Sequence, residues 1–154
     1  MTPDSVDRVI LSMLQENART SNAEIARTVG IAPSGVLERI RKLEQRGIIK
    51  GYHADIDAAA LGQGLTAFVR MRTGFNDEHT KALEALVSMP VVLEIHETAG
   101  DDCLMLKIRV ADMKAYSEFL NNRIRKTEGI RDTSTTMVIS TAKNHQFVDI
   151  PDPD

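Results

Sequence analysis

The sequence predicts an α+β protein of two domains, because its hydrophobic pattern changes partway along the chain. Up to residue 54, apolar residues recur at the three- and four-residue spacing of helices. From residue 65 to 143, stretches of alternating apolar and polar residues, typical of strands, are interleaved with two helical stretches. Residues 55–64 end in glycines and predict a linker. Residues 144–154, acidic and broken by prolines, predict a frayed tail.

The first domain is predicted to contain three short helices, and the first carries an apolar stripe from Val6 to Leu14. Ser21 followed three residues later by Glu24 is a capping box, so the second helix is expected to begin near residue 22. Gly30 ends that helix, because a helix commonly stops at a residue in the left-handed conformation that glycine adopts readily.

The third helix is expected to begin at Pro33 and to end at Gly47. Its inner face carries Val36, Ile40 and Leu43. A helix, a glycine turn and a second helix, followed by a short strand or wing at residues 48–52, form the pattern of a winged helix-turn-helix. Such a motif presents its second helix to the major groove of DNA.

The distribution of charge also favours the third predicted helix as the DNA-contacting element. The net charge is −3, but residues 1–55 contain eight Lys and Arg against seven Asp and Glu, and the rest of the chain contains 11 against 15. Between residues 33 and 50 there are five basic residues and two acidic ones, as a phosphate-contacting element requires. An ordinary solvated helix of a three-helix bundle would often carry a similar cluster. The residues predicted to enter or border the groove are Ser34, Gly35, Leu37, Glu38, Arg41 and Lys42, and those predicted to contact phosphates are Arg39 and Lys50.

The second domain is predicted to follow the order β-α-β-β-α-β, the ferredoxin-like plan, in which both helices cover one face of an antiparallel four-stranded sheet. We expect aliphatic side chains on the other sheet face, too many to remain in water, and therefore a second copy of the chain packed over them. The predicted strands are residues 65–72, 91–98, 103–110 and 131–141, and the predicted helices are residues 77–89 and 112–129.

Several classes of function are disfavoured. The single cysteine, Cys103, allows no internal disulfide, which fits a reducing cytoplasm. We expect this residue to be packed in the core of the second domain. No apolar stretch reaches the roughly 18 residues of a membrane span. The four histidines show no pairing with a nucleophile and an acid, and no metal-ligand spacing occurs. We therefore expect neither an enzyme nor a bound metal or cofactor.

The chain resembles the Lrp/AsnC family of transcriptional regulators over residues 6–143. The segments that carry the resemblance are NARTSNAEIARTVGIAPSGVLERIRKLEQRGIIKGY, LGQGLTAFVRMR and HETAGDDCLMLKIRVADMKAY. The resemblance implies an N-terminal winged helix-turn-helix for double-stranded DNA and a C-terminal ferredoxin-like domain (the RAM domain). It also implies homodimers that often assemble into octamers or open spirals, with a small amino-acid effector bound between dimers.

Carried over onto this sequence, the family's effector loop falls on Thr98, Ala99, Gly100, Asp101 and Asp102. Besides this loop, we expect Asn122, with Asn121, to add side-chain contacts from a neighbouring dimer. Ala32 stands where relatives commonly have Ser, and Cys103 and Leu104 stand where many have Asp and an aromatic residue.

Two other functions remain open from the residues alone. Gly100 and the two acids after it also suit a plain turn between antiparallel strands, and the protein would then be a ligand-independent architectural DNA-binding protein. An enzyme on a ferredoxin-like fold is the third possibility, and the lack of a converging acid, base and nucleophile argues against it.

Overall fold

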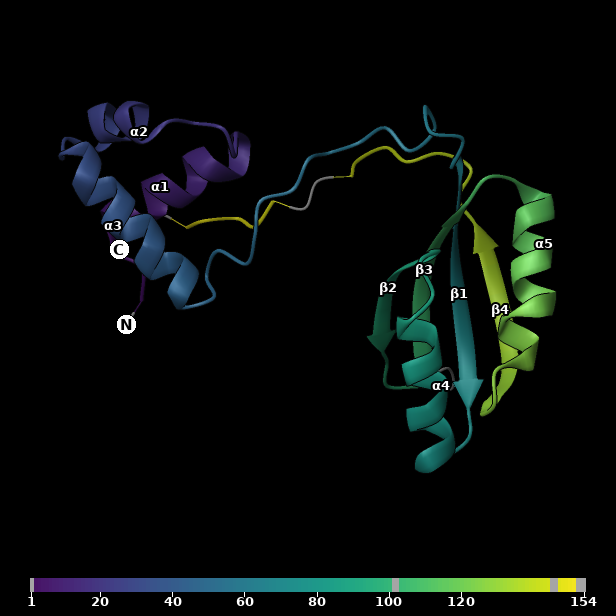
Figure 1. Cartoon of the computed structure of the whole chain (residues 1–154). Helices are drawn as coiled ribbons and strands as arrows, with labels where there is room; N and C mark the ends of the chain where they lie inside the picture. The colour runs from purple at the N-terminus through teal and green to yellow at the C-terminus, as the bar shows by residue number, and fades with distance from the viewer. Residues whose placement is uncertain (1, 101–102, 145–146, 152–154) are drawn as a thin grey trace. The chain divides into compact units, whose positions relative to one another are not determined.

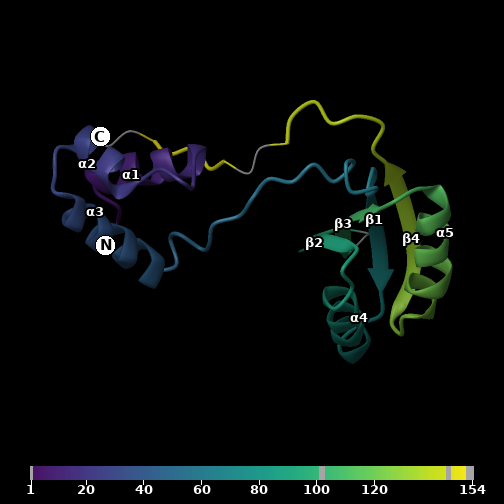
Figure 2. The same ribbon diagram turned by 45° about the horizontal axis from the view of Figure 1, so that its top comes forward.

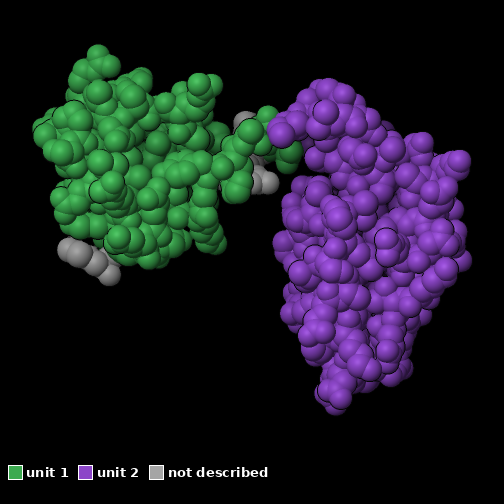
Figure 3. All heavy atoms as spheres, viewed as in Figure 1, with its two compact units in different colours: residues 1–55, 144–154 green, residues 56–143 purple. Residues whose placement is uncertain are grey.

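In the computed structural model, which describes residues 2–100, 103–144 and 147–151, the chain forms two compact units. One comprises residues 1–55 and 144–154, and the other residues 56–143 (Figure 3).

The first unit contains three helices, α1 (Ser5–Glu16), α2 (Asn22–Val29) and α3 (Pro33–Gln45) (Figure 1). Each helix contributes its apolar stripe to one core, as the three- and four-residue spacing predicts. The buried core residues are Ile10, Ile25, Ala26, Val36, Ile40 and Leu43.

The helix ends follow local capping rules. The hydroxyl of Ser21 accepts from the backbone N–H of Glu24 at 3.2 Å, and Gly30 ends α2 in the left-handed conformation with φ of 72°. Ala32 stands at the N-cap of α3 and provides no side-chain hydrogen bond. At α1 the structure adds a cap that sequence analysis missed: Asp4 and Asp7 form a reciprocal capping box.

Residues 48–52, expected as a short strand or wing, form no strand. The amides of Ile48 and Ile49 both donate to the carbonyl of Leu43 and close the end of α3. No helix or strand covers residues 51–57. A strand needs a neighbour to take its backbone hydrogen bonds, and the described part of this unit contains no other strand.

The second unit is an antiparallel sheet of order β2-β3-β1-β4 with two helices (Figures 1 and 2). The inward residues of β1 and β3 form one core with residues of both helices, so the helices share one sheet face. The α+β fold predicted from the sequence is confirmed, with final-strand and helix ends shorter than expected. The elements are β1 (Leu65–Thr73), α4 (Asp77–Val87), β2 (Val92–Glu97), β3 (Leu104–Val110), α5 (Met113–Asn122), a 3-10 turn (Ile124–Lys126) and β4 (Ile130–Met137).

The sheet face without helices carries mainly charged side chains, which corrects the expectation of an aliphatic surface. Phe68 and Met105 are its apolar residues on the two central strands. Around them, Arg72 pairs with Asp132 across β1 and β4, and Lys107 pairs with Glu94 at 2.9 Å across β3 and β2. The alternation along each strand sends the aliphatic residues to the helix-covered face, and the polar residues between them form this one. The other residues of this face include Arg70, Arg109, His96 and Ser134.

The C-terminal segment also differs from the frayed tail that was expected. The side-chain amide of Gln15 donates to the carbonyl of Val148 at 2.9 Å and accepts from its N–H at 2.8 Å. Arg8 donates to the carbonyl of Pro151. The described residues 147–151 are thus attached to α1, because its polar side chains satisfy the backbone of a segment that forms no regular structure.

Candidate functional site

The candidate DNA-contacting surface is the outer face of α3. Val36, Ile40 and Leu43 point into the core, and the helical periodicity therefore turns the remaining side chains outward. Apart from Arg39, the predicted residues on α3 share its outer face. Ser34, Leu37, Glu38, Arg41 and Lys42 are exposed, Gly35 is half-buried, and Lys50 is exposed in the segment after the helix.

Gly35 has no intramolecular reason to be glycine. A Cβ placed there would meet the nearest atom, Cδ1 of Ile31, at 3.6 Å, an ordinary contact distance. Glycine inside a helix costs about 0.5–1 kcal/mol relative to alanine. A glycine with neither crowding nor a left-handed conformation, on the exposed side of α3, suits close approach of another molecule to the helix backbone.

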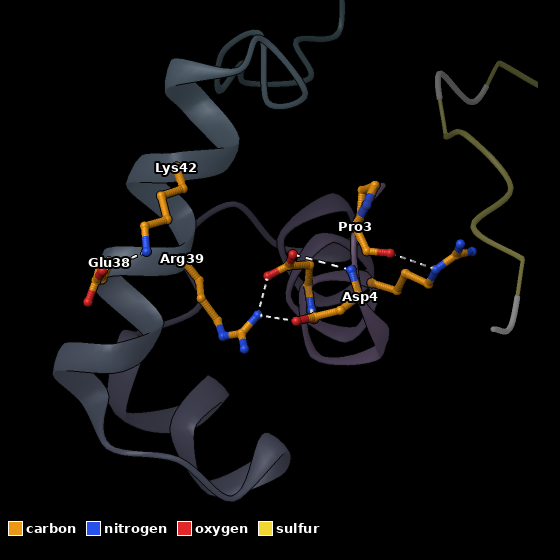
Figure 4. Close-up of polar contacts among 7 residues, drawn as sticks. Pro3, Asp4, Glu38, Arg39 and Lys42 are labelled. Carbon is orange, nitrogen blue, oxygen red and sulfur yellow. Dashed lines mark hydrogen bonds and ion pairs between the residues drawn. The ribbon is translucent and has the colours of Figure 1, made fainter. Parts of the chain in front are cut away.

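Arg39 is directed toward α1 (Figure 4). Its Nη1 lies 2.7 Å from Oδ2 of Asp4 and 2.7 Å from Oδ1 of Asp7. These hydrogen bonds raise the pKa of the Arg39 guanidinium. The pKa of Asp4 is lowered, first by the backbone N–H of Asp7 and then by Arg39. Arg39 therefore joins α3 to α1, whereas the sequence predicted a phosphate contact.

Glu38 and Lys42 form an i,i+4 ion pair at 2.7 Å on the outer face of α3 (Figure 4). Lys42 lowers the pKa of Glu38, which is fully exposed. Solvent screens such an exposed pair, so it contributes little to stability. It can therefore open at little cost when another polar surface approaches.

The candidate effector loop joins β2 to β3. The N–H of Thr98 donates to the carbonyl of Cys103 at 2.9 Å and closes the base of the turn, in which Gly100 has φ of +140°. Asp101 and Asp102 lie outside the described residues. Asn122, at the end of α5, lines a groove on the helix-covered side.

Four side chains at the base of this loop form a chain of hydrogen bonds that the sequence did not predict. Oγ1 of Thr73 lies 2.8 Å from Nδ1 of His79 and 3.1 Å from Sγ of Cys103, and Nε2 of His79 lies 3.2 Å from Glu97. Nothing in the sequence indicated this contact of His79 with a hydroxyl and a carboxylate. Cys103 is half-buried, and its thiol sulfur accepts a hydrogen bond from the N–H of Thr73, so this residue makes polar contacts as well as packing contacts. Cys103 lies 30 residues from Thr73 in the sequence and Glu97 lies 18 residues from His79, so the fold of the unit brings them together beside the loop.

Within the described residues, no helix combines the length and apolar character needed to cross a bilayer. No three His, Cys, Asp or Glu residues among them gather where they could share a metal ion.

The three-helix unit, with one helix presenting a basic and polar face, and the ferredoxin-like unit together define a helix-turn-helix transcriptional regulator. Residues 3–50 match a family model described as winged helix-turn-helix DNA-binding, and residues 66–148 match one described as the Lrp/AsnC ligand binding domain. The chain belongs to the Lrp/AsnC family, which confirms the resemblance.

Relatives of known name support this assignment. The leucine-responsive regulatory proteins of Escherichia coli (strain K12) and Klebsiella pneumoniae are each 36% identical to the chain over 142 residues, covering 91% of it and 87% of their own length.

Solved structures agree. A transcriptional regulator from Neisseria meningitidis in complex with L-methionine matches with a TM-score of 0.91 and 29% identity, covering 96% of this chain and 97% of its own. Escherichia coli AsnC matches with a TM-score of 0.90 and 29% identity, covering 96% and 99%. A feast or famine regulatory protein from Mycobacterium tuberculosis complexed with L-methionine matches with a TM-score of 0.89 and 31% identity, covering 97% and 100%.

Proposed function

We propose that this protein is a sequence-specific, double-stranded-DNA-binding transcriptional regulator of the cytoplasm that responds to a small amino acid. The observation that carries the proposal is the outer face of α3. It combines a guanidinium (Arg41), an ammonium (Lys42), a carboxylate (Glu38), an apolar flank (Leu37) and a glycine at which the backbone is accessible. These groups match the hydrogen-bonding edges and thymine methyl groups of the major groove.

The proposed effector site is the turn of residues 98–102 with Asn122 contributed by a neighbouring dimer. Backbone amides of a glycine-containing turn suit an α-carboxylate, and side-chain oxygens suit an ammonium. Two structural relatives were solved with L-methionine, which makes methionine the first probe.

We further propose that the protein is a homodimer, assembling to an octamer, that pairs through the sheet face without helices. Charged rather than aliphatic side chains on that face support the pairing of two copies. A two-fold interface brings the same patch of both copies together, and a patch that carries both Arg72 with Asp132 and Lys107 with Glu94 is electrostatically self-complementary. Phe68, 36% exposed at the centre of this face, supplies an apolar contact.

The decisive experiment is footprinting on the protein's own promoter region with and without a panel of amino acids, together with calorimetry of each amino acid. We expect a discrete protected site whose extent or affinity changes with at least one amino acid. Uniform, sequence-independent protection with no heat of binding would favour the architectural function instead. Absence of any DNA binding at low salt would reject the regulator proposal.

A further inference from the structure

Phe75 is an aromatic side chain on the surface of the second unit. It follows the end of β1 directly, precedes α4, and is 86% exposed. Single exposed apolar residues are common on protein surfaces and need no explanation by themselves. The backbone that holds this one is what distinguishes it.

The turn around Phe75 is held in one conformation. The next residue, Asn76, has φ of 53° and ψ of −117°, which is rare for a residue with a side chain. The N–H of Gly74 donates to the carbonyl of Gly129 at 2.8 Å. A Cβ on Gly129 would lie 2.2 Å from the carbonyl oxygen of Glu78, so the start of α4 packs directly on that backbone. Phe75 is therefore carried by a strained turn that is hydrogen-bonded to and packed on the neighbouring backbone, and such preorganisation reduces the entropy lost on docking.

A groove of about 380 Å³ runs along α5 in the same unit. Val91, Val110, Ala115 and Phe119 provide apolar lining, and Glu118 and Arg123 contribute charged groups at the side of α5. No hydrogen bond or ion pair of the described residues engages the side chain of Glu118 or Arg123. The groove thus combines an apolar lining large enough for an aromatic ring with two charges of opposite sign.

We propose that Phe75 of one copy of this chain inserts into the α5 groove of a second copy. The flanking residues suit that occupant. Asp77, exposed two residues after Phe75, is complementary to the guanidinium of Arg123, and the side-chain amide of Asn76 is a donor for Glu118. An aromatic anchor in an apolar pocket with a polar rim is the common form of an interface hot spot.

The contact is head-to-tail. Phe75 follows the end of β1, whereas the groove lining includes Val91, just before β2, and Val110, at the end of β3, which runs antiparallel to β1. The two features therefore lie toward opposite ends of the strands. Each copy then offers one anchor and one groove, and such a heterologous contact repeats until it closes a ring or grows as an open chain. It rests on the proposed self-association of this chain and is independent of DNA binding. Combined with pairing through the open sheet face, it would join dimers into larger assemblies.

Sedimentation velocity of the full chain tests the proposal. The variant Phe75→Ser is expected to weaken association between dimers by about tenfold to a hundredfold, from loss of one buried aromatic side chain, and to sediment as a dimer. Val87→Ser is the matched control, because Val87 is 69% exposed on α4 and lies outside the groove lining; it should keep the wild-type mass. DNA binding by Phe75→Ser would show that the variant is folded.

A cross-link identifies the contact itself. In a Cys103→Ser background, protein carrying Phe75→Cys is mixed with protein carrying Ala111→Cys, which places a thiol at the groove. A disulfide between the two proteins under mild oxidation, absent when Val87→Cys replaces Phe75→Cys, supports insertion. If the wild-type protein sediments with a mass greater than that of a dimer and Phe75→Ser has the same mass, the Phe75 contact is wrong, but the proposed self-association is not contradicted. If wild type is monomeric at micromolar concentration, both are wrong.

Discussion

Arg39 on α3 and Asp7 on α1 are joined by a 2.7 Å ion pair across 32 residues of sequence. Asp7 uses its other carboxylate oxygen to accept from the N–H of Asp4, and Asp4 accepts from the N–H of Asp7 at 2.8 Å while it also binds Arg39. The capping box of α1 and the attachment of α3 are therefore one network. Its geometry holds the helix that carries the proposed DNA-contacting side chains.

Arg39→Ala should destabilise the N-terminal unit by about 1–2 kcal/mol, because the nearly buried carboxylate of Asp7 would lose its charged partner. Arg39 is itself a third exposed, and solvent screening keeps the effect below that of a buried pair. Urea unfolding of the full chain measures the change. Arg39→Lys should recover part of the stability; an unchanged midpoint for Arg39→Ala would show that the network contributes nothing.

The same network makes the unit sensitive to acid. Backbone and guanidinium hydrogen bonds lower the pKa of Asp4 in the folded state, so the folded state favours the carboxylate. This stabilisation is fully present above the unfolded pKa of about 3.9 and is lost as the pH falls through the lower folded value. Thermal unfolding between pH 6 and pH 2 should show the loss in wild type. The loss should be smaller in Asp4→Asn, where only Asp4 has been removed from the network.

Arg41 and Lys50 should differ in how they affect DNA binding. Arg41 lies on the exposed face of α3, and Arg41→Ala should cost about 1–3 kcal/mol of specific binding and relax the preference for one base. Lys50→Ala should weaken binding to all sequences alike and reduce the salt slope by about 1. Fluorescence anisotropy with matched and scrambled duplexes over a salt series separates the two. Equal losses on both duplexes for Arg41→Ala would remove Arg41 from the base-reading residues.

Ala32→Ser should stabilise α3 by about 1 kcal/mol. Ala32 has the extended backbone of an N-cap with φ of −68° and ψ of 147°, and it lacks the side-chain oxygen that would accept an N–H of the first turn. The gain should appear as a higher midpoint in urea. Ala32→Val, which adds size without an acceptor, is the control and should show no gain.

Gly129→Ala should destabilise the second unit by about 2 kcal/mol or more. Gly129 has φ of +89°, and an added Cβ would collide with the backbone of Glu78. Gly64→Ala is the comparison, because nothing lies within 4 Å of the position and its φ is not positive. Differential scanning calorimetry of both variants measures the contrast, and a similar small shift in both would contradict the tight packing at Gly129.

Local patterns identified most of the secondary structure. The stripe through Ile10, the Ser21 cap, Gly30 and Pro33 each depend on interactions within a few residues, and such interactions can be read directly from the chain. Residues 48–52 were expected as a short strand or wing, and they form no strand because strand formation depends on a partner that the local sequence does not contain.

The amino-acid order alone determined the helix-turn-helix, the β-α-β-β-α-β sequence of elements and the outward face of α3, since periodicity sets which side chains share a face. Only the tertiary structure decided that Arg39 turns inward to Asp4 and Asp7 and that Cys103 meets Thr73. Each of these depends on contacts between residues distant in the chain. Such contacts are determined by how the elements pack and pair, so no local pattern encodes them.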